Sequence, residues 1–165
     1  MIIGVVSGKG GVGKTTIASN LSYYLSQVGK NVTLVDCNVT TSHINFSFGF
    51  FSFNKTLNNV LRGEAEIWEV IYKYKTLNIV PASLRLEDLS YIDLMSLGKA
   101  IRNINSEFVF LDSAPGFGKE AISTLNSVDS VLITTTPFMA SIADILRMKK
   151  IIDELNIYPL GIVLN

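Results

Sequence analysis

A glycine-rich stretch near the N-terminus constrains the fold of this chain more than any other feature of its sequence. Residues 7–16 read SGKGGVGKTT and contain the spacing G-x-x-x-x-G-K-[ST], with Gly8, Gly13, Lys14 and Thr15 at its fixed positions. A short apolar run precedes the stretch, and apolar residues at helical spacing follow it. Glycines let the backbone turn sharply and aim several N–H groups at phosphate oxygens, while the start of a helix adds a positive dipole end. The pattern predicts a phosphate-binding loop; the alternative is a glycine-rich turn with a solvated lysine.

The residue types in this loop suit the phosphate tail of a nucleotide. We expect the Lys14 ammonium group to bridge the β- and γ-phosphates and the Thr15 hydroxyl to ligate Mg²⁺. Thr16 is expected to support the start of the helix or to contact the α-phosphate. The residues predicted to contact nucleotide in this loop are Gly8, Lys9, Gly10, Gly11, Val12, Gly13, Lys14, Thr15 and Thr16.

Short apolar runs alternate with longer helical patterns along the chain. Most of these runs are continuously apolar, which is typical of parallel strands covered on both faces. The strand-like runs span residues 2–6, 32–35, 77–80, 108–111, 131–133 and 160–164, and helical spacing occupies 17–28, 94–104 and 142–155. Gly29 stands where a glycine would end the first helix. The alternation predicts an α/β fold, a three-layer sandwich with a mostly parallel sheet between helices.

The length of 165 residues predicts one nucleotide-binding domain over residues 1–165. Because the last residue, Asn165, directly follows a strand-like run, we expect the chain to lack a C-terminal portion of the protein.

Composition excludes several classes of protein. The chain has 14 basic residues (Lys and Arg) and 14 acidic residues (Asp and Glu), so its formal net charge is zero. This balance disfavours binding of nucleic acid or of an anionic membrane through a broad basic surface, but it does not exclude a local basic patch. The single cysteine, Cys37, rules out an internal disulfide framework and a four-cysteine metal site. The chain has no apolar run of about 18 residues, and its N-terminus lacks the basic start of a signal peptide. We therefore expect a cytoplasmic location.

A second motif places a carboxylate at the end of a predicted strand. The apolar run 108–111 ends at Asp112, an arrangement that in nucleotide-binding sheets holds Mg²⁺ through water. On its own, a carboxylate at this position also fits a helix N-cap. Together with the phosphate loop, we favour the metal-binding interpretation for Asp112.

The stretch 7–16 as a whole, with Lys9 directly after the first glycine, resembles the deviant phosphate-binding motif of the MinD/ParA family of dimeric ATPases. The resemblance implies a phosphate-loop NTPase fold with ATP or ADP and Mg²⁺ as its ligands. It also implies that Lys9 contacts the nucleotide of the partner subunit in an ATP-dependent homodimer, so that nucleotide state and dimerisation are coupled. The alternative for Lys9 is a solvated loop lysine.

The resemblance extends to two segments that change with nucleotide state in this family. Asp36, at the end of the second predicted strand, is implied to order the waters of Mg²⁺, and Gly116 to offer an N–H group to a γ-phosphate. Asn38 stands where the family usually has the aspartate that positions the attacking water. An amide can orient water but cannot accept a proton at neutral pH, so we predict slow hydrolysis and a faster Asn38→Asp enzyme. The alternative is that Asn38 is only a turn residue.

The resemblance also bears on the last residue of the chain and on the aromatic stretch after Asn38. Asn165 occupies the place of the family's adenine-reading asparagine, whose amide pairs with the edge of the base. In the aromatic stretch after Asn38, Phe46 and Phe48 are predicted to be core residues. Phe50, Phe51 and Phe53 have more freedom to form an exposed patch for a partner.

The function that the resemblance implies is a slowly hydrolysing ATPase switch, used to position the cell-division site or another structure. Its expected partners are a second copy of the chain and an unidentified regulatory protein, and membrane attachment is expected only through residues beyond Asn165. One alternative is a DNA-partition ATPase, which the zero net charge disfavours. Another is a nucleotide-gated scaffold with negligible hydrolysis, which Asn38 makes plausible. An iron–sulfur relative would need more thiols than Cys37 alone.

Overall fold

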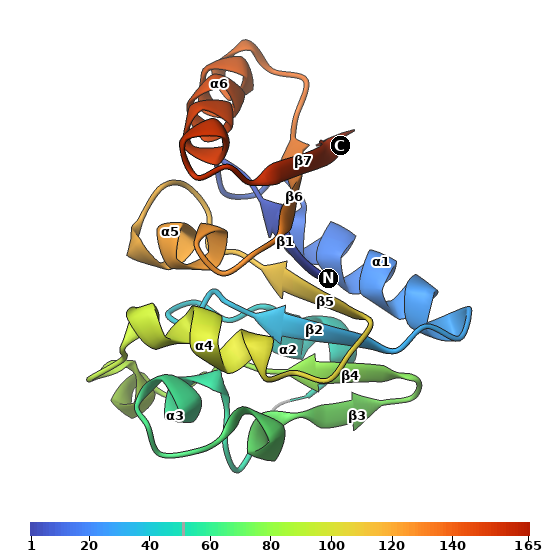
Figure 1. Ribbon diagram of the computed structural model, residues 1–165, viewed down its shortest axis with the longest axis vertical. Coiled ribbons are helices and arrows are strands. Elements are labelled where there is room, and N and C mark those ends of the chain that lie inside the picture. The colour runs from blue at the N-terminus through green and yellow to red at the C-terminus, as the bar shows by residue number, and fades with distance from the viewer. Residues whose placement is uncertain (51) are drawn as a thin grey trace.

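The computed structural model describes residues 1–50 and 52–165 and shows helices on both faces of one twisted sheet (Figure 1). Seven strands form this sheet in the order β3-β4-β2-β5-β1-β6-β7. All neighbouring strands pair in parallel except β3 and β4, which form an antiparallel hairpin. The strands are β1 Ile2–Val6, β2 Val32–Asp36, β3 Tyr72–Tyr74, β4 Leu77–Val80, β5 Phe108–Asp112, β6 Ser130–Thr135 and β7 Tyr158–Leu164. The predicted α/β fold with a mostly parallel sheet is confirmed, and β3 is the strand that the apolar pattern missed.

The helices cover the two faces of the sheet around two separate hydrophobic cores. They are α1 Lys14–Gln27, α2 Ile44–Phe48, α3 Leu57–Leu61, α4 Leu97–Arg102, α5 Lys119–Leu125 and α6 Met139–Glu154, with 3₁₀ turns at Ile67–Val70, Leu86–Leu89 and Leu94–Ser96. One core lies between the sheet and helices α1 and α2 and includes strand residues such as Ile3 and Leu34. The other lies between the opposite face of the sheet and helices α3, α4, α5 and α6, and it includes the adjacent strand residues Ile2 and Val35. This alternation along each strand is the reason that the runs are apolar throughout.

Two predicted helices differ in detail from the structure. The helical pattern over 94–104 divides into a 3₁₀ turn and α4. As predicted, Gly29 terminates the first helix: α1 ends at Gln27, and Gly29 follows the C-cap residue with a left-handed φ of 87° and donates its N–H group to Ser26 O at 3.3 Å. However, Tyr24 and Val28 of the predicted apolar face are exposed, and small residues, among them Ser22, form the buried side of α1. Small side chains allow this helix to lie close to the sheet.

The aromatic stretch folds against the edge of the sheet. Phe46 is 59% exposed, so its assignment to the core was wrong, whereas Phe48 is partly buried against a core cluster. Phe50 and Phe53 pack ring against ring with centroids 5.4 Å apart and are half-buried, which contradicts the predicted exposed patch. Phe51 lies outside the described residues. None of the helices in the described part of the chain has the length and apolar character needed to cross a membrane.

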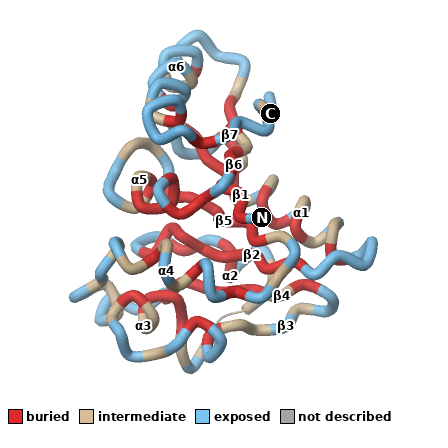
Figure 2. The backbone as a smooth tube through the Cα atoms, in the orientation of Figure 1, coloured by how far each residue is buried: buried red, intermediate tan, exposed pale blue. Residues whose placement is uncertain are grey.

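The parallel sheet brings the predicted site residues to one edge. The C-terminal ends of β1, β2 and β5 lie side by side in the centre of the sheet, where the backbone is buried (Figure 2). In the register of the strands, Asp36 is paired with Asp112, and Val5 of β1 is paired with Asp112 on the other side. The phosphate loop continues from β1 at this same edge, so strand pairing alone places it beside both carboxylates.

Candidate nucleotide-binding site

The phosphate loop connects β1 to α1 and requires glycine at particular positions. Gly11 and Gly13 have left-handed φ values of 74° and 90°. A Cβ atom on Gly13 would lie 2.5 Å from Asn165 Nδ2, and one on Gly8 would lie 2.5 Å from the Cβ atom of Asp144. Only glycine permits these close approaches, so the loop keeps this conformation while packed against Asp144 of α6 and against Asn165.

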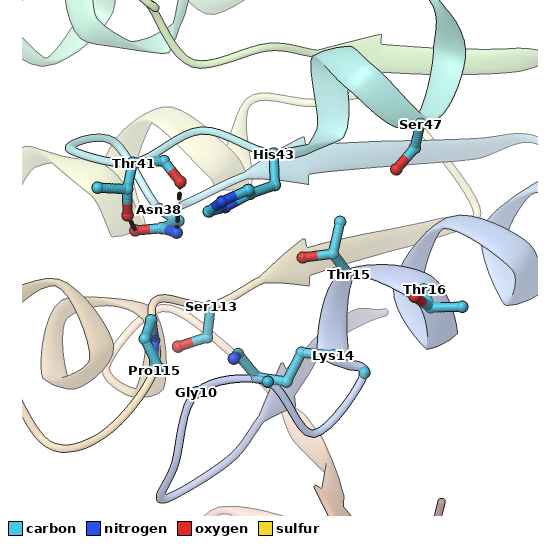
Figure 3. Close-up of a pocket in the computed structure, with 12 residues that line it drawn as sticks. Gly10, Lys14, Thr15, Thr16, Asn38, Thr41, His43, Ser47, Ser113 and Pro115 are labelled. Carbon is cyan, nitrogen blue, oxygen red and sulfur yellow. Dashed lines mark hydrogen bonds between the residues drawn. The ribbon is translucent and has the colours of Figure 1, made fainter.

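The loop and the start of α1 form one wall of a cavity of about 490 Å³ (Figure 3). The opposite wall comes from the segment after β2 and from the segment after β5. The lining residues are Gly10, Gly11, Gly13, Lys14, Thr15, Thr16, Asn38, Thr41, His43, Ser47, Ser113 and Pro115. Hydroxyl, amide and ammonium groups thus surround a space at the N-terminal, positive end of a 14-residue helix. Such a space favours the binding of an anion.

Lys14 is the buried cation of this cavity, with 7% of its surface exposed. Burial lowers the pKa of its ammonium group, and the nearby Asp112 carboxylate opposes that change. The first turn of α1 contains no acidic residue, so the helix end is not neutralised locally.

The two strand-end carboxylates are almost completely buried, Asp36 at 0% and Asp112 at 2% exposure. Burial raises the pKa of Asp36 to about 6, and burial together with the charge of Asp36 raises the pKa of Asp112 to about 7. Asp36 accepts hydrogen bonds from Ser42 Oγ at 2.7 Å and from two backbone N–H groups, which limit the rise of its pKa. The Thr15 hydroxyl and the Lys14 ammonium group do the same for the pKa of Asp112.

The carboxylates fit a divalent cation that also takes ligands from elsewhere. Asp112 Oδ1 is buried and has no hydrogen-bond partner among the described residues, so this oxygen is left for a ligand. Within residues 1–50 and 52–165, no group of three or more His, Cys, Asp and Glu side chains is placed to hold a metal alone. Mg²⁺ is usually bound through one or two carboxylates together with substrate phosphates and water. The donor set of Thr15, Asp36 and Asp112 therefore suits Mg²⁺ that accompanies a phosphate.

The structure places seven of the fourteen predicted site residues in the lining of this cavity. From the loop and from the segment after β2, those that line it are Gly10, Gly11, Gly13, Lys14, Thr15, Thr16 and Asn38. Val12 is buried beneath the loop, and Gly8 packs against α6. Lys9 is exposed and is not among the lining residues.

Two other predicted contacts bind the loop itself in this structure. The Gly116 N–H group donates to Ser7 O at 3.0 Å, and Gly116 does not line the cavity. Asn165 donates from Nδ2 to Val12 O at 3.1 Å, so its side chain contacts the loop from behind Gly13. Both residues therefore support the shape of the loop.

Sequence reasoning missed part of the cavity wall. His43 and Ser47 line it but belong to no recognisable spacing. Ser113 and Pro115 also line it, although within their segment only Gly116 was predicted to contact nucleotide. Ser42 also has a role in the site, because its Oγ donates a hydrogen bond to the Asp36 carboxylate. Its one available signal was its place between a strand-end aspartate and the next helix, which is shared by many loop residues.

A phosphate loop at the C-terminal edge of a parallel sheet, beside paired strand-end carboxylates, defines a nucleotide-binding protein with the phosphate-loop NTPase fold. Comparison with known proteins agrees. A family model described as an AAA domain matches residues 1–158. An uncharacterized ATP-binding protein of Methanocaldococcus jannaschii is 34% identical over an alignment that covers 100% of this chain and 64% of that protein.

Solved structures give the same result. The cell division ATPase MinD of Pyrococcus furiosus has a TM-score of 0.95 and 30% identity, with 99% of this chain and 71% of the other covered. The septum site-determining protein MinD of Pyrococcus horikoshii, complexed with Mg-ADP, has the same TM-score of 0.95 and 30% identity, with 99% and 69% covered. The chain belongs to the AAA domain family that this model describes and to the MinD/ParA family of ATPases. It spans 64% and 63% of the length of two curated M. jannaschii relatives.

Proposed function

We propose that this chain binds ATP with Mg²⁺ in the cavity beside the phosphate loop and hydrolyses the ATP slowly to ADP and phosphate. The observation that carries the proposal is that Lys14 and Thr15, which line one cavity of about 490 Å³, interact with the buried Asp112, whose strand neighbour is the buried Asp36. The relative from P. horikoshii is a complex with Mg-ADP, and the M. jannaschii relative is described as ATP-binding, which supports the same ligands here.

In this proposal each element of the site has one task. The backbone N–H groups from Gly10 to Thr15 hold the phosphate tail, and Lys14 bridges its β- and γ-phosphates. Thr15, Asp36 and Asp112 hold Mg²⁺, directly or through water. When bound, Mg²⁺ would neutralise negative charge on the phosphates and on the two carboxylates. Gly8, Gly116 and Asn165 keep the loop in shape, and Asn165 is also proposed to meet the adenine.

Asn38 is proposed to orient the water that attacks the γ-phosphate. Its side chain lines the cavity opposite Lys14, which is the side a nucleophile would approach from (Figure 3). An amide oxygen accepts a hydrogen bond from water but takes no proton at neutral pH. Phosphoryl transfer depends mainly on positioning and on charge stabilisation, so hydrolysis proceeds without a general base, but slowly.

The proposed cycle includes an ATP-dependent homodimer in which the exposed Lys9 of each subunit reaches the nucleotide of the other. Relatives named as a flagellum site-determining protein and a septum site-determining protein support a role in spatial positioning. A regulatory protein is a further proposed partner. The second candidate function is a nucleotide-gated scaffold with negligible hydrolysis. The neutral amide at position 38, which takes no proton from an attacking water, favours this candidate.

Phosphate release and light scattering, each measured with and without Mg·ATP, test the proposal. Wild-type protein should release phosphate and dimerise with ATP. Lys14→Ala should lose nucleotide binding, and Lys9→Ala should keep binding but lose the dimer. Lys149→Ala, on the exposed face of α6, is the matched control and should behave as wild type. Dimerisation without turnover would favour the scaffold, and nucleotide binding that survives Lys14→Ala would refute the site.

A further inference from the structure

A pair of hydrogen bonds joins the side chain of Asn38 to Thr41, three residues later. Asn38 Nδ2 donates to the backbone carbonyl oxygen of Thr41 at 2.6 Å, and Thr41 Oγ1 donates to Asn38 Oδ1 at 2.9 Å (Figure 3). We call this pair the amide latch. Both ends of the Asn38 side chain are therefore held by one neighbouring residue.

The chemistry of the latch fixes which way the amide faces. A backbone carbonyl oxygen can only accept, so the atom of Asn38 beside it must be the nitrogen. The amide oxygen then faces the Thr41 hydroxyl, which donates to it and leaves one lone pair unused. A carboxylate at position 38 could not form the first bond, because two acceptor oxygens would face each other. The conformation of this loop is thus specific for asparagine.

The latch is joined to the predicted metal site through the backbone. The Asn38 N–H group donates to Asp36 Oδ1 at 3.1 Å, so the peptide and the side chain of Asn38 are both anchored. Asn38 is only 7% exposed, and it shares the lining of the cavity with Thr41. Thr40, the adjacent threonine, is exposed and absent from the lining, and its side chain interacts with Glu120 on α5.

We propose that Thr41 is the positioning residue for Asn38: its hydroxyl holds the amide so that the unused lone pair of Oδ1 receives the attacking water. The inference rests on the proposed ATPase function and explains how a neutral residue can serve at this position. Removing the hydroxyl leaves the amide held only by its bond to the Thr41 backbone carbonyl, so the amide oxygen is held less firmly and a smaller fraction of the protein has it in place. Nucleotide affinity does not depend on that oxygen.

The kinetic test uses three single variants under saturating Mg·ATP. Thr41→Val keeps the shape but loses the hydroxyl, and kcat should fall about tenfold, which corresponds to the loss of about one hydrogen bond, while KM stays within about twofold. Thr41→Ser retains the hydroxyl and should recover most of the rate. Thr40→Val makes the same chemical change one residue away and should match wild type. An unchanged kcat in Thr41→Val, or an equal loss in Thr40→Val, overturns the proposal.

A double-mutant cycle separates positioning from a general structural effect. In an Asn38→Ala background the hydroxyl has nothing to hold, so adding Thr41→Val should change kcat by less than about twofold. An additive tenfold loss in that background shows that Thr41 acts independently of Asn38 and refutes the latch role.

A measurement without nucleotide makes the proposal independent of turnover. The side-chain amide resonances of Asn38, identified by their loss in Asn38→Ala, should shift in Thr41→Val and stay near their wild-type positions in Thr41→Ser. Resonances that do not respond to Thr41→Val overturn the latch whatever the activity. If the wild-type protein shows no turnover, the proposed hydrolysis is refuted, and with it the effect of Thr41 on the rate. If turnover occurs but is the same in wild type and Thr41→Val, only the latch role is refuted.

Discussion

The two buried carboxylates make the metal-free protein less stable at alkaline pH, and Asp112→Asn should remove part of this cost. Burial and the charge of Asp36 raise the pKa of Asp112 from 3.8 to about 7. A carboxyl group whose pKa is raised by folding binds its proton more tightly in the folded state. The stability that it contributes is present below pH 4, and it is lost as the pH rises through about 7.

The size of the effect follows from the change in pKa. One pKa unit corresponds to about 1.4 kcal/mol, so a rise of roughly three units gives about 4 kcal/mol as an upper bound at pH 8. Because Asp112→Asn also removes a charge that stabilises the buried Lys14 ammonium group, the net gain in the free energy of unfolding should be about 2–3 kcal/mol. At pH 4.5 the difference between the two proteins should be small.

Urea unfolding followed by far-UV circular dichroism, in EDTA and from pH 4.5 to 8.5, measures this difference. Asp153→Asn is the matched control, since Asp153 is an exposed carboxylate in a surface ion pair with Lys149, and its effect should stay below about 1 kcal/mol at every pH. In a separate series without EDTA, Mg·ADP should stabilise wild type more than Asp112→Asn, because the variant lacks a carboxylate proposed to hold the metal. A difference between wild type and Asp112→Asn that is constant with pH, or larger at pH 4.5, would refute the reasoning.

Three further changes test the loop and the segment after β2. The affinity of Gly13→Ala for ADP, measured by titration, should fall at least about tenfold, because a Cβ atom there is strained at a φ of 90° and lies 2.5 Å from a side-chain amide. The control is Gly63→Ala, which also has a positive φ, 74°, but faces open space; its affinity for ADP should be unchanged. Asn38→Asp should raise turnover in a phosphate-release assay, yet lower the unfolding free energy of the metal-free protein by about 1–3 kcal/mol, because its carboxylate would face a backbone carbonyl. Ser42→Ala removes a donor that keeps the pKa of Asp36 down, so the Mg²⁺ concentration for half-maximal turnover should rise severalfold, more at pH 6.5 than at pH 8. An equal rise at both pH values would contradict this role for Ser42.

The amino-acid sequence by itself determined the features that depend on local chemistry. Glycine spacing and the apolar runs beside it predicted a phosphate loop between a strand and a helix, and continuous apolar runs predicted a sheet covered on both faces. Both are confirmed in the fold, because backbone freedom at glycine and burial of apolar side chains act within a few residues of the chain. The ends of β2 and β5 were also recognisable, since each apolar run stops at an aspartate.

Only the tertiary structure decided what these residues meet. Strand order places Asp36 beside Asp112, although 76 positions separate them in the chain, and burial together with this pairing raises the pKa of Asp112. Phe46 looked like a core residue, but it lies on the exposed side of a one-turn helix, which no apolar count could show. The amide latch on Asn38 likewise depends on the path of the chain between a strand end and α2. Such contacts arise from loop conformation and from long-range pairing, which residue types do not encode locally.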